Sequence, residues 1–129
     1  ILNSMLGNFA KGKNKKITKE ILERNKEFKR GLIRAFYDDE GSINARGGEI
    51  RLFQDKKDIL ETFRTLLLEF GIEPTQIKTY MKKNKKRFYF SIHRKSNLIK
   101  FQREIEFTSP KKREILQMMC SRRNHWNDK

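Results

Sequence analysis

Apolar residues along the chain follow two spacings, and each spacing predicts a different kind of element. Three- and four-residue spacings, typical of amphipathic helices, run through residues 28–36, 59–70, 98–105 and 111–120. Apolar and polar residues alternate over residues 42–54 and 77–93, as expected for hairpins that bury one face. The order of these segments predicts an α+β unit in which helices cover one face of an antiparallel sheet.

Turn-forming residues in the first half of the chain set the expected ends of these elements. Thr18 is a candidate N-cap for a short helix that precedes residue 28. Gly41 follows the first long helix, where a glycine in the left-handed conformation commonly ends a helix. The Gly47-Gly48 pair predicts a two-residue turn within the first hairpin.

The second half of the chain carries similar signals. Asp55 or Asp58 opens the helix over residues 59–70, and Gly71 ends it. A basic turn over residues 82–86 connects the strands of the second hairpin. One side of that hairpin is apolar, and the other side is basic, aromatic and hydroxyl-bearing.

The charge of the chain narrows the choice of partners. The 129 residues include 31 Lys and Arg against 16 Asp and Glu, which is a formal net charge of +15. Such an excess is typical of proteins that bind nucleic acid, although a merely basic or ribosomal-type protein shares it. One cysteine excludes an internal disulfide and fits a reducing compartment inside a cell, either prokaryotic cytoplasm or an organelle.

The length of the chain suits one domain with a single core. We expect that domain over residues 17–120, after a basic tail or linker remnant over 1–16 and before a polar tail over 121–129. No apolar run approaches the roughly 20 residues that cross a membrane.

Three consecutive acids stand at the end of the first long helix. A helix C-terminus carries partial negative charge and favours Lys or Arg, yet Asp38, Asp39 and Glu40 occupy it here. A bound divalent cation would compensate these acids. Gly31 and Ala35 lie four residues apart on the same helix, and their small size would let a second helix pack closely.

A resemblance to a known family is carried by the segment IRAFYDDEGSI, residues 33–43. It resembles the LAGLIDADG motif of homing endonucleases and intein endonuclease domains, in the archaeal form with Glu as the last acid. Arg34 and Asp39 stand where that motif usually has small residues. The resemblance extends over about residues 17–119, and implies an αββαββα unit whose sheet forms a saddle for DNA.

The resemblance implies roles for the acids. In the family the last acid of each motif binds the catalytic metal, so Glu40 is the implied Mg²⁺ ligand. Asp39 would add its backbone carbonyl rather than its side chain, and Asp38 would cap or pair with a base. Without the resemblance, the same acids would be interpreted as a solvated turn at a helix end.

Two further polar positions are implied as catalytic by the resemblance. Gln54 ends a strand where family members place a Gln or similar residue near the water around the metal, although an ordinary strand-end residue has the same pattern. Lys111 lies in EFTSPKKREIL, which resembles the family segment with an active-site lysine that would stabilise charge on the phosphate. Lys112 is the alternative, and either lysine could simply contact a phosphate.

The polar faces of the two hairpins form the candidate DNA surface. A twisted two-stranded ribbon fits the major groove, where Arg recognises guanine and Lys mainly contacts phosphates. Any one member could be a solvated sheet residue, so the hypothesis depends on the whole set. That set is Arg46, Arg51, Lys78, Tyr80, Lys82, Arg87, Tyr89, Ser91 and His93.

These features predict a site-specific double-strand DNA endonuclease that uses Mg²⁺ for phosphodiester hydrolysis. Because the chain holds one motif, it would act as a homodimer on a roughly palindromic site or together with a second LAGLIDADG repeat. One rival is a DNA- or RNA-binding module that keeps the fold without cleavage. Another is a structural or interaction domain of an intein or multidomain host, although splice-junction signatures are absent from the chain.

Overall fold

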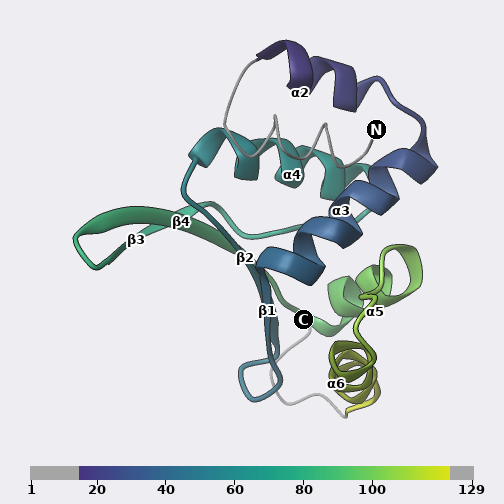
Figure 1. The fold of residues 1–129 in the computed structure, drawn as a ribbon. Helices are drawn as coiled ribbons and strands as arrows, with labels where there is room; N and C mark the ends of the chain where they lie inside the picture. Colours follow the sequence, from purple (N-terminus) through teal and green to yellow (C-terminus); the bar gives the residue numbers. More distant parts are fainter. Residues whose placement is uncertain (1–14, 123–129) are drawn as a thin grey trace.

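The computed structural model describes residues 15–122 of the chain, with side chains from residue 19 onward. Within this range, two helices precede the first hairpin, a third lies between the hairpins, and two more follow (Figure 1). This order confirms the predicted α+β unit. The helices are α2 (Lys15–Leu22), α3 (Lys26–Glu40), α4 (Lys57–Glu69), α5 (Lys95–Glu104) and α6 (Pro110–Ser121), and the strands are β1 (Gly41–Asn44), β2 (Glu49–Gln54), β3 (Lys78–Lys82) and β4 (Lys85–Ile92).

The strands pair antiparallel in one sheet, in the order β1-β2-β4-β3. Leu52 of β2 stands opposite Phe90 of β4, and both side chains are buried in the core. The next pair, Phe53 and Tyr89, points to the other side of the sheet and is half-buried. The sheet therefore has a covered face, against the helices, and an open face.

The helix α3 packs on β1, β2 and α4 and forms the centre of the fold. Asn25 caps its N-terminus, because the side-chain oxygen accepts a hydrogen bond from the Phe28 N–H at 2.9 Å. Leu32 and Phe36 belong to its buried side. The amphipathic pattern of the sequence thus places one side of α3 in the core.

Gly41 follows α3 in a conformation different from the predicted one. Its φ of −85° and ψ of 150° are those of a strand, and β1 begins at this residue. A Cβ atom at Gly41 would lie 2.5 Å from the carbonyl oxygen of Tyr37. The prediction of a left-handed glycine was wrong, because the chain needs glycine here for its close approach to the helix.

The first hairpin has a longer loop than predicted. Asn44 stands opposite Glu49 as the last pair, so residues 45–48 form the loop and the predicted two-residue turn was wrong. The Asn44 side-chain oxygen accepts a hydrogen bond from the Gly47 N–H at 3.1 Å. Such a local bond competes with the strand ladder and ends the pairing early.

Two predicted helix caps were also wrong. Thr18 lies inside α2, since that helix begins earlier in the chain. Lys56 occupies the cap position of α4 without a side-chain cap, while Asp58 lies in the first turn and Asp55 forms ion pairs with β4. Gly71 follows α4 with a φ of 78°, and this confirms the predicted end of that helix.

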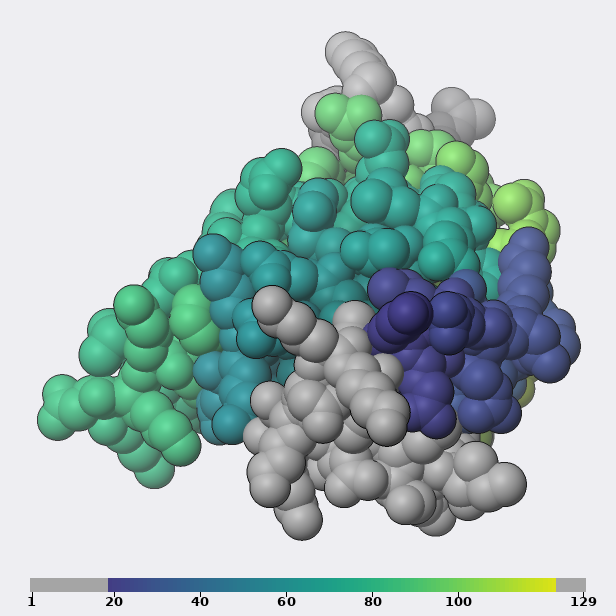
Figure 2. Space-filling model, turned by 90° about the horizontal axis from the view of Figure 1, so that it is seen from above, coloured from purple at the N-terminus to yellow at the C-terminus, as the bar shows by residue number. Residues whose placement is uncertain are grey.

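The outer part of the second hairpin projects from the body as an arm, residues 78–86 (Figures 1 and 2). Its turn is shorter than predicted, with φ of 52° at Lys83 and 63° at Asn84, as a tight hairpin turn requires. Met81 lies on the apolar side of the alternating pattern, yet its side chain is 64% exposed. The helices do not extend over the arm, so both faces of the hairpin meet solvent near Met81.

The helices α5 and α6 pack on each other and close the core beside α3. Phe101 and Phe107 contact the ring of Tyr37, with centroids 4.9 and 6.3 Å away. Leu116 and Met119 of α6 are buried, as predicted. Within residues 15–122, no helix combines the length and apolar character needed to cross a membrane. The predicted tails lie largely outside the described residues.

Candidate functional site

The acidic end of α3 lies close to the end of β2. Glu40 has a raised pKa, first because burial desolvates its carboxyl group, and then because Asp39 and Asp55 repel its negative charge. Arg87 of β4 acts in the opposite direction and lowers the pKa of Glu40. The fold therefore gathers three carboxyl groups at what we call the acidic centre, Glu40, Asp39 and Asp55.

Asp55 links the acidic centre to β4. Its Oδ1 atom lies 2.7 Å from Arg87 Nε, and its Oδ2 atom lies 3.7 Å from Lys85 Nζ. Gln54, one of the predicted catalytic residues, comes directly before it, and Gln54 Oε1 accepts a hydrogen bond from the Asp55 N–H at 3.2 Å. The sequence indicated Asp55 only as a helix start, although its position next to Gln54 could have placed it at the site.

One of the two candidate lysines reaches the end of α3. Lys112 Nζ donates to the carbonyl oxygens of Asp38 at 3.3 Å and Gly41 at 3.2 Å. Lys111 is exposed at the preceding position of α6. A cation at these carbonyls compensates the negative end of the helix dipole. Of the two candidates, Lys112, the alternative in the prediction, is therefore the one that contacts the end of α3.

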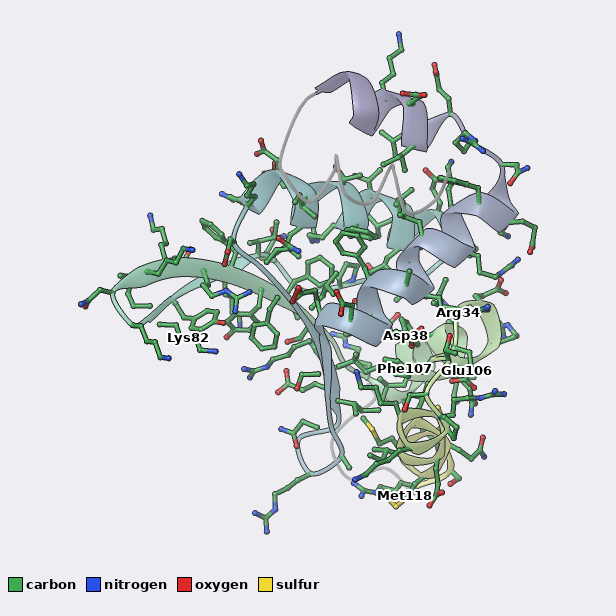
Figure 3. The ribbon with its side chains drawn as sticks, viewed as in Figure 1. Arg34, Asp38, Lys82, Glu106, Phe107 and Met118 are labelled. Atoms are coloured by element: carbon green, nitrogen blue, oxygen red, sulfur yellow. The ribbon has the colours of Figure 1, made fainter. Side chains whose placement is uncertain are left out.

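Arg34 and Asp38 fasten α3 to the connection between α5 and α6 (Figure 3). Arg34 Nε donates to the Ile105 carbonyl oxygen at 2.8 Å, and Asp38 Oδ1 accepts from the Thr108 N–H at 2.9 Å. The two side chains lie four residues apart on one side of the helix. Asp38 thus caps a backbone N–H, and Arg34, a departure from the motif, has a structural role.

The strand register brings most of the predicted DNA surface together on the open face. Arg51 stands opposite Ser91, Tyr89 opposite Lys78, and Tyr80 opposite Arg87. Arg46 lies apart from them, exposed in the loop of the first hairpin, and His93 lies just beyond β4. The residues that share the open face are Arg51, Lys78, Tyr80, Lys82, Arg87, Tyr89 and Ser91.

A closed charge network occupies the middle of the open face. Arg51 donates through Nε and Nη2 to the two carboxylate oxygens of Glu49, at 3.0 and 3.1 Å. These bonds lower the pKa of Glu49, and the hydroxyl of Ser91, 2.7 Å from Glu49 Oε1, adds to the effect. Ser91 is only 5% exposed. Its prediction as a surface contact was wrong, because its hydroxyl is buried beneath the network.

Three aromatic rings lie together beside this network and form the aromatic cluster, Phe53 of β2, Tyr80 of β3 and Tyr89 of β4. Their ring centroids are 5.8 Å apart for Phe53 and Tyr80, 5.6 Å for Phe53 and Tyr89, and 5.7 Å for the two tyrosines. The guanidinium of Arg51 lies 4.7 Å from the Tyr89 centroid. The alternating pattern placed Phe53 on this face, but gave no reason to single it out.

Lysines extend the positive charge outward from the cluster. Lys78 and Lys82 are exposed on the open face of β3. Figure 3 places Lys82 on the arm, away from the helices. The open face therefore combines paired charges near its middle with exposed lysines along the arm.

The side of α3 that carries the small residues Gly31 and Ala35, which we call the small face, is open in the single chain. A Cβ atom at Gly31 would meet nothing within 4 Å, and Ala35 is half-buried. A second helix could approach at this face. Pairing through Gly31 and Ala35 stays a prediction.

The acidic centre offers few side-chain ligands for Mg²⁺. Among residues 15–122, no group of three or more His, Cys, Asp or Glu side chains is arranged to hold a metal ion. Protein sites for Mg²⁺ often supply only one or two carboxylates and leave the other positions to water and substrate phosphate. Glu40, with Asp39 beside it, fits such a shared site better than a complete protein cage.

A comparison with protein families matches the LAGLIDADG-like domain to residues 27–106, more than half of the chain. The chain belongs to the LAGLIDADG family. The LAGLIDADG match contains both hairpins and almost all of α3, but ends before α6. It therefore confirms the resemblance and the homing-endonuclease-like fold. Lys112 lies outside the match, so its position at the end of α3 is known from the structure alone.

The LAGLIDADG chain is also similar to a protein of Methanocaldococcus jannaschii, the DNA-directed RNA polymerase subunit Rpo1C. The two are 38% identical over 125 residues, which is 95% of this chain. The chain spans only 14% of the length of that relative.

Proposed function

We propose that this LAGLIDADG unit belongs to a site-specific double-strand DNA endonuclease that requires Mg²⁺. The supporting observation is the acidic centre, where Glu40 is held with a raised pKa beside two other acids. Ionisable groups held against mutual repulsion are typical of functional sites. The net charge of +15 and the lysines of the open face suit a polyanionic substrate.

The residues of the acidic centre have distinct proposed roles. Glu40 would hold Mg²⁺ together with the scissile phosphate, and Asp39 would contribute its carbonyl oxygen. When bound, Mg²⁺ would supply Lewis-acid polarisation of the phosphodiester. Gln54 would orient the attacking water, and Lys112 would hold the end of α3 and stabilise charge that develops on the phosphate.

One chain supplies one Glu40, whereas cleavage of a duplex requires attack on two strands. We propose that a second unit provides the other site, either in a homodimer or as a second LAGLIDADG repeat. The two α3 helices would pack through Gly31 and Ala35, and a homodimer would favour a roughly palindromic target.

A second candidate function is a LAGLIDADG module that binds DNA or RNA without cleavage. Two observations favour it: the name of the relative is that of a polymerase subunit, and the described residues form no complete metal cage. A match to a small part of a longer protein also fits a LAGLIDADG unit carried inside a host chain, as intein endonuclease domains are.

Cleavage of a random-sequence DNA library separates the two candidates. The chain should cut both strands in Mg²⁺, should be inactive in EDTA, and should lose cleavage but keep binding as Glu40→Gln. Binding by the wild-type chain in Mg²⁺ without any cutting would favour the second candidate.

Stability measurements test Glu40 without reference to cleavage. Because its folded pKa is raised, ionised Glu40 destabilises the folded chain as the pH rises through that pKa, so Glu40→Gln should unfold at a higher temperature at neutral pH. Mg²⁺ should stabilise the wild-type chain more than this variant. Glu61→Gln, on the exposed side of α4, is the matched control and should change neither result.

The oligomeric state tests the role of the small face. Gly31→Ala should fold well and gain about 1 kcal/mol of helix stability in a single chain, since nothing obstructs its Cβ. Gly31→Leu should prevent helix pairing and lower the mass in solution. An unchanged mass for both variants would contradict packing through α3.

A further inference from the structure

The aromatic cluster has no part in the proposed hydrolysis, yet it lies beside the acidic centre. Phe53 directly precedes Gln54 and Asp55 in β2. Tyr80 stands opposite Arg87, whose Nε atom lies 2.7 Å from Asp55 Oδ1. The three rings thus share the open face with Arg87, which pairs with Asp55 of the acidic centre.

The chemistry of the cluster suits the face of a nucleobase better than its edge. In a duplex, base edges offer hydrogen-bond donors and acceptors to polar side chains in the grooves. Phe53 has no polar atom in its side chain, and the guanidinium above Tyr89 is already bound to Glu49. Aromatic rings instead stack on bases whose faces have been exposed by unstacking.

The charge around the cluster fits the backbone of the same strand. Lys78 and Lys82 are exposed on β3, the strand that carries Tyr80. Rings that stack on bases and lysines that track phosphates are the common features of surfaces that hold unpaired nucleic acid. Phe53, Tyr80 and Tyr89 are each half-buried, so part of each residue meets solvent.

We propose that the aromatic cluster binds an unstacked base of the DNA strand next to the cleavage site. This proposal rests on the proposed function for the choice of DNA as the ligand. It adds that the substrate is distorted when bound, with at least one base removed from the duplex stack. A cluster that only braces the arm through cross-strand ring contacts would give no preference for unpaired bases.

The test uses short DNA duplexes with 2-aminopurine, either paired or as a single unpaired base, in buffer without Mg²⁺. The wild-type chain should bind the unpaired form about tenfold more tightly, because base stacking on an aromatic ring contributes on this scale. Its binding should also quench the fluorescence of the unpaired 2-aminopurine. Equal affinity for both duplexes, or unchanged fluorescence, would overturn the proposal.

Matched variants separate stacking from bracing. Tyr89→Phe should keep the preference, whereas Tyr89→Leu should lose it, with the salt dependence of binding unchanged because no phosphate contact is removed. Met81→Ala, on the other face of β3, is the control and should bind like the wild type. Equal losses for the paired and unpaired duplexes in Tyr89→Leu would show that the cluster only braces the arm.

Two further results distinguish this proposal from the proposed function. Preference for the unpaired DNA base without any Mg²⁺-dependent cleavage would support base binding by the aromatic cluster and contradict the proposed endonuclease function. Cleavage without this preference would support the endonuclease function and contradict base binding by the cluster. Tighter binding of an RNA duplex with the same unpaired base would overturn the assignment to DNA.

Discussion

The two faces of the sheet are built from the same strands but serve different purposes. On the covered face, Leu52 and Phe90 are fully buried. The neighbouring pair, Phe53 next to Leu52 and Tyr89 next to Phe90, points to the open face and remains half-buried. Because neighbouring residues of a strand point in opposite directions, stability and binding can be altered separately along one strand.

The open face itself differs between its middle and its arm. In the middle, Arg51 is bound by Glu49, and Arg87 forms an ion pair with Asp55. A guanidinium held in this way must break or share its contact before it can bind a guanine or a phosphate. We therefore expect the exposed Lys78 and Lys82 to contribute more to phosphate binding than the paired arginines.

The largest expected effect is on the covered face. Phe90→Ala should lower the free energy of unfolding by about 3–5 kcal/mol, because it leaves a cavity between sheet and helices. Urea denaturation measures this loss. Met81→Ala on the arm should stay within about 0.5 kcal/mol of the wild type, and similar losses in both variants would contradict the contrast between core and arm.

The next largest expected effect is on DNA binding by the open face. The double variant of Lys78→Ala and Lys82→Ala should reduce the slope of log affinity against log salt by about two, one for each lost phosphate contact. Its unfolding free energy should change by about 0.5 kcal/mol or less. Affinity measured over a series of salt concentrations checks this, and an unchanged slope would place the phosphate contacts elsewhere.

A smaller effect concerns a polar atom within the covered core. The Tyr37 hydroxyl is buried without a hydrogen-bond partner among the described residues, and burial raises the pKa of Tyr37 well above its usual range. Tyr37→Phe removes this unsatisfied group and should stabilise the chain by about 1 kcal/mol. Thermal unfolding of the two chains is the measurement. A lower melting temperature for Tyr37→Phe would contradict the view that the Tyr37 hydroxyl is unsatisfied.

The smallest effect concerns the charge network of the open face. The folded pKa of Glu49 is lowered, so its contribution to stability is present above the pKa of the unfolded chain and is lost as the pH falls through the folded value. When the pH falls below about 4.5, the usual pKa of such a carboxyl group, the Glu49→Gln chain should therefore lose less stability than the wild-type chain. Unfolding curves at neutral and acid pH test this, and parallel pH profiles would contradict the role of the network.

The sequence alone was sufficient for the elements and for the division of the sheet into two faces. Helical and strand periods are local properties, so the end of α3 at Glu40 and the alternation of Arg51 with Leu52 could be predicted from neighbouring residues. The motif around Glu40 also indicated the family. Loops and caps were less predictable, since the side chain of Asn44 and the close contact at Gly41 shifted the expected ends.

Only the tertiary structure decided which distant residues meet at the site. It brought Asp55 and Arg87 to Glu40, chose Lys112 rather than Lys111 for the end of α3, buried Ser91 and joined three rings into a cluster. These outcomes depend on the register between strands and on the packing of α6, which are determined by contacts between residues far apart in the chain. A local pattern shows which side of an element a residue occupies, but the partner on that side depends on the closure of the whole core.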